Sequence, residues 1–203
     1  MPVSIEGYMG VGIAALAAMT RIAFFGHDAA DAAVRRRVQG FQDDGLEVVG
    51  FMMRRRDDVQ TSWENIDLGK TFDGDYAQRL ESILSGAQRA IAHRQKLESA
   101  EVIYARNLDM LATAFLARKR LKLKTPVIYE SLDVHRLLTR NDVIGLTFRR
   151  LEGWLLERTS RLIVSSPAFL KNHFEVHYPG RFEARLIENR LAPGADYGPR
   201  PAP

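Results

Sequence analysis

The chain has 203 residues, of which 46% are hydrophobic and 27% are charged. These proportions are typical of a soluble, packed protein with room for one sizeable domain. There is no cysteine, which excludes a disulfide framework, a thiolate metal site and a cysteine nucleophile, and fits a cytoplasmic location. The net charge of +4 comes mostly from arginines. It indicates an anionic partner other than nucleic acid, whose binders concentrate their charge more strongly.

The two ends of the chain are expected to lie outside the folded core. Residues 1–18 are expected to form an upstream extension, with Met19 as an alternative start. The apolar run within them is too short to span a bilayer, and no basic residue precedes it as in a signal peptide. A short membrane contact is the alternative. Residues 19–190 are predicted to form the domain, and the prolines of residues 191–203 predict a linker or tail.

Strands and helices are predicted to alternate along the domain. Helical spacing of apolar residues predicts helices over residues 29–44 and 75–97, and others starting near residues 107, 141 and 167. Residues 54–70 are expected to be mostly loop, with a short strand near residue 66. Continuous apolar runs predict strands at 22–25, 46–53, 101–105, 126–129, 162–164 and 184–187. The alternation predicts an α/β fold with one doubly wound, mostly parallel, Rossmann-like sheet.

Two helices are expected to bury apolar stripes. The stripe predicted for the helix over 75–97 includes Leu80 and Leu84. The helix that begins near Asn141, its predicted cap, is expected to bury Ile144, Phe148, Leu151 and Leu155.

A ligand site is expected beyond the carboxyl ends of the strands, because open parallel sheets bind ligands there. The loop after the first strand reads Gly26-His27-Asp28-Ala29-Ala30-Asp31. It lacks the repeated glycines that let the backbone approach a pyrophosphate, so nicotinamide and flavin cofactors are not expected. No zinc site is predicted, and no metal is expected.

The densest group of ionisable residues at a strand end is Glu130, Asp133 and His135. These residues are the candidates for catalysis, because they could bind sugar hydroxyls or transfer a proton. In the alternative interpretation Asp133 caps a turn, Glu130 pairs with an arginine and His135 lies on the surface.

Other strand-end residues are candidates for substrate binding. Asn107 and Ser165-Ser166 could equally be ordinary helix caps. The candidates are His27, Asp28, Arg106, Asn107, Ser165 and Ser166.

Three basic groups could form a surface that meets anionic lipid headgroups or a lipid diphosphate, although solvated helix faces explain them equally well. They are Arg35–Arg37, Arg54–Arg56, and the set Arg118, Lys119, Arg120, Lys122 and Lys124.

Two stretches resemble the N-terminal domain of family-4-like GT-B glycosyltransferases, in particular the bacterial exopolysaccharide enzymes of the succinoglycan type. They read VIYARNLDMLATAFLARKRLKLKTPVIYESLDVHR and RRLEGWLLERTSRLIVSSPAFLKNHF. In the second stretch a helix rich in Leu, Glu and Arg leads into a strand that ends in Ser and then a short helix. The resemblance covers about residues 21–191.

This resemblance implies two Rossmann-like domains that face each other across a cleft, the first holding the acceptor and the second the nucleotide sugar. It implies transfer with retention and without a metal or other cofactor, to a lipid-linked or oligosaccharide acceptor. It also implies a cytoplasmic enzyme, either free or peripheral at the inner membrane. Its donor-binding domain is expected to lie outside this chain, so that the chain alone is inactive. Leu132 stands where the family has a histidine, so His135 is the candidate to replace it.

Two other functions remain open from the sequence. One is a non-catalytic Rossmann-like binding or assembly module. The other is a different GT-B enzyme, such as a sugar epimerase.

Overall fold

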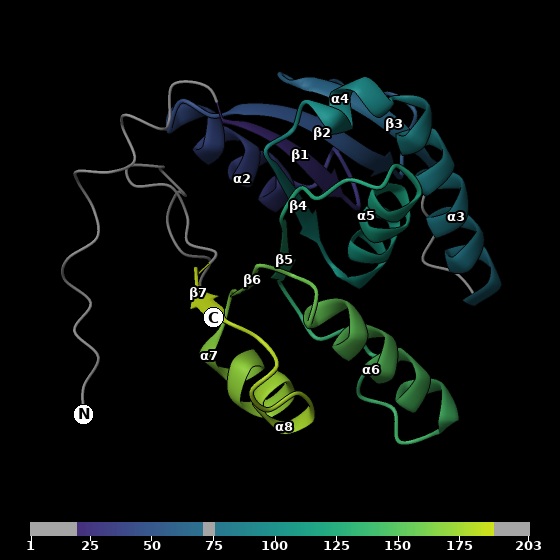
Figure 1. The fold of residues 1–203 in the computed structure, drawn as a ribbon, viewed down its shortest axis with the longest axis vertical. Coiled ribbons are helices and arrows are strands. Elements are labelled where there is room, and N and C mark those ends of the chain that lie inside the picture. Colours follow the sequence, from purple (N-terminus) through teal and green to yellow (C-terminus); the bar gives the residue numbers. More distant parts are fainter. Residues whose placement is uncertain (1–19, 71–75, 189–203) are drawn as a thin grey trace, which may run out of the picture.

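A computed structural model of the chain describes residues 20–70 and 76–188 (Figure 1). The predicted N-terminal extension and proline-rich tail lie outside these residues, as does residue 75, where a helix was expected to begin. No helix in the described ranges combines the length and the apolar character that crossing a bilayer requires.

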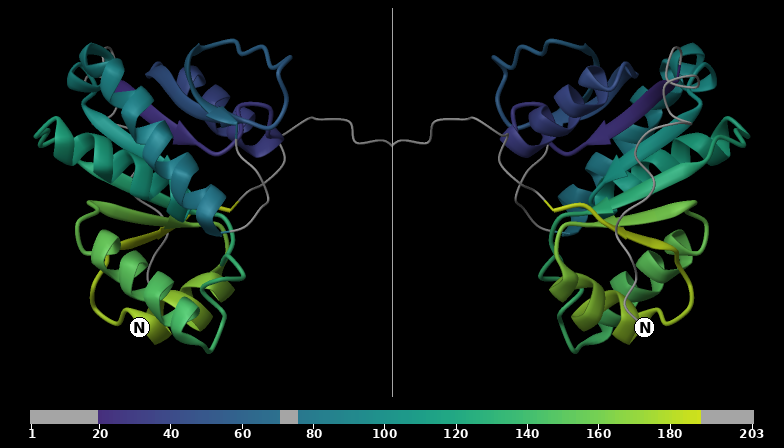
Figure 2. Two further views of the ribbon diagram at one scale, coloured as in Figure 1. Left: turned by 90° about the vertical axis from the view of Figure 1, so that its right-hand side faces the viewer. Right: turned by 90° about the vertical axis from the view of Figure 1, so that its left-hand side faces the viewer.

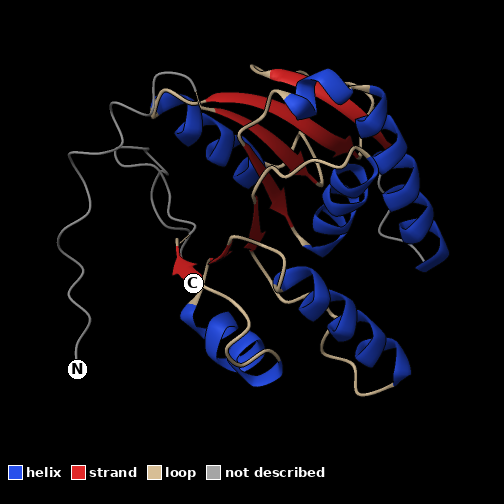
Figure 3. Cartoon of the chain, in the orientation of Figure 1, coloured by secondary structure: helices blue, strands red, loops and turns tan. Residues whose placement is uncertain are grey.

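The described residues form one seven-stranded, all-parallel sheet in the order β3-β2-β1-β4-β5-β6-β7 (Figure 3). The expected loop over residues 54–70 contains a full strand at the edge, where β3 pairs with β2. The predicted doubly wound α/β fold is confirmed. The strands are β1 (Arg21–Gly26), β2 (Glu47–Arg54), β3 (Glu64–Lys70), β4 (Val102–Arg106), β5 (Val127–Ser131), β6 (Arg161–Val164) and β7 (Ala184–Leu186).

Helices cover both faces of the sheet (Figures 1 and 2). Alternate residues of β1 point to opposite faces, so that Phe24 packs with helix α2 while Phe25 packs beneath α5. The helical segments are α2 (Ala32–Asp43), α3 (Tyr76–Ala92), α4 (Arg94–Glu98), α5 (Leu108–Arg120), α6 (Val143–Leu156), α7 (Pro167–Phe169), the π-helical turn η1 (Leu170–Phe174) and α8 (Glu175–His177).

Side-chain caps determine where several helices begin. Asp31 starts α2 by accepting hydrogen bonds from the backbone N–H groups of Ala33 and Val34, both at 2.9 Å. The expectation that Asn141 caps α6 is wrong, because Asp142 is the residue that accepts from Gly145 N, at 3.0 Å. A carboxylate is an equally good cap one residue later.

Parts of both predicted apolar stripes are exposed. Leu80 and Leu84 of α3 are 58% and 49% exposed, and Leu151 of α6 is 38% exposed. On α6 the buried face includes Glu152 and Gly153 instead, next to Leu155 and Leu156. Periodicity alone treats a glutamate as a surface residue, so it missed Glu152, although Leu155 of the predicted stripe is buried and Phe148 packs against the core.

Glu152 is a fully buried carboxylate that joins three elements. Tyr129 of β5 donates its hydroxyl to Oε1 at 2.9 Å. Tyr178, after α8, donates to Oε2 at 2.8 Å, and His173 Nε2 of η1 lies 2.7 Å from the same oxygen. A buried carboxylate with this many partners is satisfied, whereas its partners would be left unsatisfied without it.

We expect Glu152→Ala to lower the free energy of unfolding by about 3–5 kcal/mol, because it leaves three buried donors without an acceptor. Glu157→Ala, at the exposed end of the same helix, removes only surface ion pairs with Arg158 and Arg181. It should cost about 1 kcal/mol or less. Urea unfolding followed by circular dichroism measures both variants, and equal losses would contradict the role given to Glu152.

Candidate functional site

The site lies next to β1, where the strand order of the sheet reverses. From β1 the chain adds β2 and β3 on one side and then returns to pair β4 with the other side of β1. The loops after β1 and β4 therefore diverge and leave a crevice at the carboxyl edge, the place where open α/β sheets bind ligands. A cavity of about 460 Å³ occupies this position. Its lining residues are His27, Arg55, Arg79, Asn107, Leu108, Asp109, Tyr129, Asp133, His135, Arg136, Leu137, Leu138 and Phe148.

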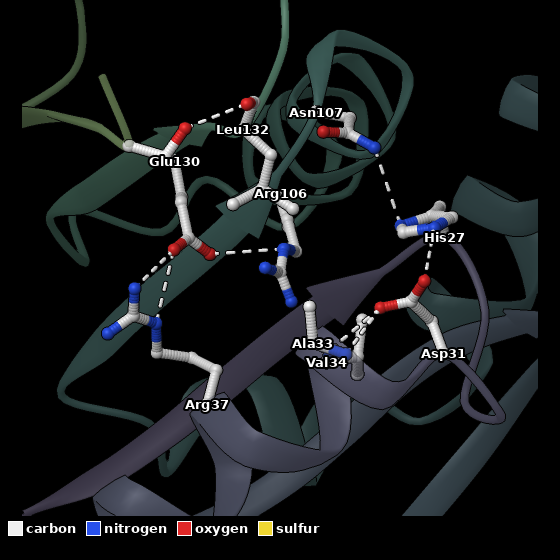
Figure 4. Close-up of polar contacts among 10 residues, drawn as sticks. His27, Asp31, Ala33, Val34, Arg37, Arg106, Asn107, Glu130 and Leu132 are labelled. Carbon is white, nitrogen blue, oxygen red and sulfur yellow. Dashed lines mark hydrogen bonds and ion pairs between the residues drawn. The ribbon is translucent and has the colours of Figure 1, made fainter. Parts of the chain in front are cut away.

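His27 and Asn107 meet across the crevice (Figure 4). Asn107 Nδ2 lies 3.4 Å from His27 Nδ1, and His27 Nε2 lies 3.8 Å from the carboxylate of Asp31. Burial lowers the pKa of His27, and the cations Arg106 and Arg55 lower it further, against the opposing effect of Asp31. His27 is therefore a neutral imidazole at neutral pH.

Asn107 stands at the N-cap position of α5, but its side chain lines the cavity and does not cap the helix. Its side chain makes no capping hydrogen bond to α5, and its backbone has φ 71°, in the left-handed region. With ψ at 160°, this conformation is one that essentially only glycine adopts freely, so the asparagine here is strained. Strained backbone of this kind tends to persist at functional sites, and here it accompanies an amide that faces His27 across the cavity.

His135 is fixed by an arginine that the sequence analysis did not select. Arg79 of α3 donates through Nε and Nη2 to Asp109 Oδ2, at 3.0 and 2.6 Å. Its remaining nitrogen, Nη1, lies 2.7 Å from His135 Nε2. Burial and then the Arg79 cation lower the pKa of His135, so that this histidine is also neutral at neutral pH.

The contacts of His135 also indicate its tautomer. Leu137 N lies 3.2 Å from Nδ1, while Arg79 approaches Nε2. A neutral imidazole has one acceptor nitrogen and arginine has only donors, so both contacts cannot be hydrogen bonds at once. The shorter one assigns the acceptor to Nε2. Arg79 thus occupies the nitrogen that a substrate hydroxyl would use.

Glu130 lies beneath the site and does not line the cavity, contrary to expectation. Its carboxylate is fully buried, and Arg37 of α2 donates to Oε1 from Nη2 and Nε at 2.6 and 3.1 Å. Arg106 Nε lies 3.2 Å from Oε2 in an ion pair without hydrogen-bond geometry. Arg106, 1% exposed, does not line the cavity either, and its side chain lies beside Glu130 (Figure 4). Burial lowers the pKa of Arg106, and Glu130 offsets part of that effect.

The remaining predicted residues lie at the same edge of the sheet but do not line the cavity. Asp28 is nearly buried and accepts from Ala30 N at 3.0 Å in a tight turn. Ser165 donates to the backbone oxygen of Leu132 at 2.8 Å, which ties β6 to the loop that carries Asp133. Ser166 caps α7 by accepting from Ala168 N at 3.2 Å. Of the candidates, His27, Asn107, Asp133 and His135 line the cavity together.

Several arginines of the predicted basic surface have partners within the domain. Arg37 pairs with Glu130, and Arg35 lies over the ring of Trp63, 6.0 Å from its centroid. Arg54 forms ion pairs with Asp57 and Asp67. The basic surface is therefore smaller than the sequence suggests.

The sequence analysis missed Arg55, Arg79, Asp109 and Arg136 as lining residues. Asp109 stands two positions after Asn107, in the first turn of α5, where acidic residues are common for helix-dipole reasons. Arg79 comes from a helix thirty residues earlier, and no local pattern connects the two. Within the described ranges, no group of three or more His, Cys, Asp or Glu side chains could hold a metal ion.

Comparison with known proteins adds sequence relatives and structural neighbours. No protein-family model matches the chain. The chain is 38% identical over 179 residues to the succinoglycan biosynthesis protein ExoL of Rhizobium meliloti (strain 1021). The match covers 85% of this chain but 44% of ExoL, so the chain spans less than half of its curated relative.

Two solved structures share the fold at low sequence identity. Sucrose-phosphate synthase from Thermosynechococcus elongatus matches with a TM-score of 0.62 and 15% identity, over 83% of this chain and 48% of the synthase. The lipopolysaccharide outer core galactosyltransferase WaaB matches with a TM-score of 0.55 and 11% identity, over 85% and 46% respectively. The resemblance predicted from the sequence is thus confirmed: this chain is a homologue of an exopolysaccharide biosynthesis protein, with the fold of one half of a GT-B glycosyltransferase.

Proposed function

We propose that this chain is the acceptor-binding half of a glycosyltransferase in exopolysaccharide synthesis. In this proposal a sugar passes from a nucleotide sugar to a lipid-linked or oligosaccharide acceptor, with retention of configuration. The acceptor binds in the cavity between the β1 and β4 loops. The nucleotide sugar is bound by a part of the longer protein outside these 203 residues, without which the chain does not catalyse transfer. The homology to ExoL motivates this assignment, and the proposal places the enzyme in the cytoplasm at the inner membrane surface.

The observation that carries the proposal is the chemistry of the cavity lining. It combines two neutral imidazoles, an amide, the carboxylates of Asp109 and Asp133, and the guanidinium groups of Arg55, Arg79 and Arg136, which together donate to and accept from hydroxyl groups. The loop after β1 has Gly26-His27-Asp28 where a pyrophosphate site needs a glycine-rich turn. Because that turn is missing after β1, we assign the cavity to sugar hydroxyls, with which its arginines also form hydrogen bonds.

Within this site we assign different roles to the two groups of predicted residues. His27, Asn107, Asp133 and His135 are proposed to contact the acceptor. Asp133 is exposed at the mouth of the cavity. His135 can accept a hydroxyl proton at Nε2 once Arg79 turns away from that nitrogen. Arg79 is therefore proposed to orient the His135 ring and to control access to Nε2. Glu130, Arg106, Asp28, Ser165 and Ser166 are proposed to be structural.

Calorimetry on the chain tests which substrate binds. Saccharide fragments of succinoglycan should bind, whereas a UDP-sugar should bind about tenfold more weakly or not at all, since no phosphate cradle is present. Tight binding of the UDP-sugar would contradict the assignment of the acceptor to this half.

Asp133→Asn and His135→Gln should each weaken saccharide binding by about five- to tenfold, because each loses one polar contact. His93→Gln is the matched control, since His93 is exposed and does not line the cavity. If neither cavity variant differs from this control in calorimetry, the acceptor does not bind there.

Arg79→Met should raise the pKa of His135 toward the ordinary value of 6.5, because it removes the cation beside the ring while the larger effect of burial remains. Arg79→Lys keeps the charge and should hold the pKa low. NMR titration of the His135 ring proton measures both variants. An unchanged pKa in Arg79→Met would show that Arg79 does not control this histidine.

A further inference from the structure

A second cavity lies on the other side of the loop that carries Asp133 and His135. Its volume is about 410 Å³, and it is lined by Val134, Leu138, Thr139, Ala168, Phe169, Asn172, His173 and His177. Leu138 lines both cavities. The loop over residues 132–139 thus has side chains in each: Asp133 and His135 in the first cavity, and Val134 in the second.

The wall of the second cavity is held rigidly. His173 is 4% exposed, and its Nε2 is fixed at 2.7 Å from the buried carboxylate of Glu152. Its ring also packs edge-on against Phe174 and Tyr178. A fully satisfied buried network of this kind fixes the orientation of the side chain that faces the cavity. Such support beneath a surface is what a preorganised binding site requires.

The backbone at this wall is unusual. Residues 170–174 form the π-helical turn η1, and π-helical turns are frequent at functional sites. With α8 following directly, His173 and His177 stand side by side, with ring centroids 5.1 Å apart. Asn172 is exposed beside them.

The lining residues select the kind of ligand. None of those given for this cavity is Arg, Lys, Asp or Glu, so an anionic headgroup or phosphate has no direct counter-charge among them. Imidazole, amide and hydroxyl groups supply hydrogen bonds, while Phe169, Val134 and Leu138 supply apolar surface. Partial burial, His173 and nearby Arg149 lower the pKa of His177, which keeps its ring neutral. A neutral ligand with hydroxyl groups and apolar C–H faces fits this combination.

We propose that the second cavity is a further saccharide subsite, so that an oligosaccharide acceptor extends from the first cavity past the loop over residues 132–139 to the surface of Phe169, Asn172 and His177. This inference rests on the proposed function, because it assumes that the first cavity holds the acceptor end. It adds that the protein recognises an acceptor of several sugar units and not its terminal sugar alone.

Histidine NMR can follow the two cavities separately in one sample. The chain has five histidines. His27 and His135 line the first cavity, His173 and His177 line the second, and exposed His93 lines neither. The ring signals are assigned with single His→Gln variants. The probes are the monosaccharides of succinoglycan and a length series of its fragments.

Monosaccharides and the shortest fragments should shift the signals of His27 and His135 alone. Longer fragments should also shift His173 and His177, while His93 stays constant. If every fragment shifts only His27 and His135, the second subsite is refuted and the proposed function stands. If no saccharide shifts His27 or His135, the proposed function fails together with this inference.

A variant pair tests the surface itself. Asn172→Ala should weaken binding of the long fragments by about fivefold and leave the shortest unaffected, since it removes one hydrogen-bonding group from the second cavity only. Lys171→Ala, the exposed neighbour that does not line the cavity, is the control. Both residues are exposed, so neither change should unfold the chain. An equal loss for short and long fragments would overturn the proposal.

Discussion

Glu130, a carboxylate without exposed surface, binds arginines from two different elements at the carboxyl edge of the sheet. Arg37 comes from α2 and Arg106 from the end of β4, so this one side chain joins α2, β4 and β5 where the crevice opens. Removing one partner of a buried ion pair is costly. The position of Asn107, which directly follows Arg106, therefore depends on charges that no ligand touches. The site is therefore shaped from below by buried ion pairs that do not line the cavity themselves.

The sequence predicted the fold well because the relevant signals are local. Apolar runs of strand length and helical periodicity place almost every element, and their alternation leaves few arrangements other than a parallel sheet. It also predicted the edge at which the site lies, since parallel strands bring their carboxyl ends together. His27, Asn107, Asp133 and His135 converge for that reason.

The rest depends on contacts between residues far apart in sequence. Arg79 and Asp109 stand on separate helices, and only packing brings them to His135. Glu152 sits in a Leu- and Arg-rich helix that looks amphipathic, so its burial against Tyr129 and His173 could not be read from periodicity. Glu130 had two interpretations in the sequence, cleft residue or partner of an arginine, and the structure supports the second. The sequence gives the type of each residue but not the direction in which its side chain points.

The strand order also bears on how the chain folds. Strands β4 to β7 lie in the sheet in the order in which they occur in the chain. This half of the sheet can therefore assemble from pairings between consecutive βα units. β1 instead finds β4 only after β2, β3 and α3 have intervened, as in the pairing of Ile22 with Val102. Closing so long a loop costs entropy before the contact forms. The crevice is bounded by this long-range junction, so the binding site exists only where the two halves of the sheet have joined.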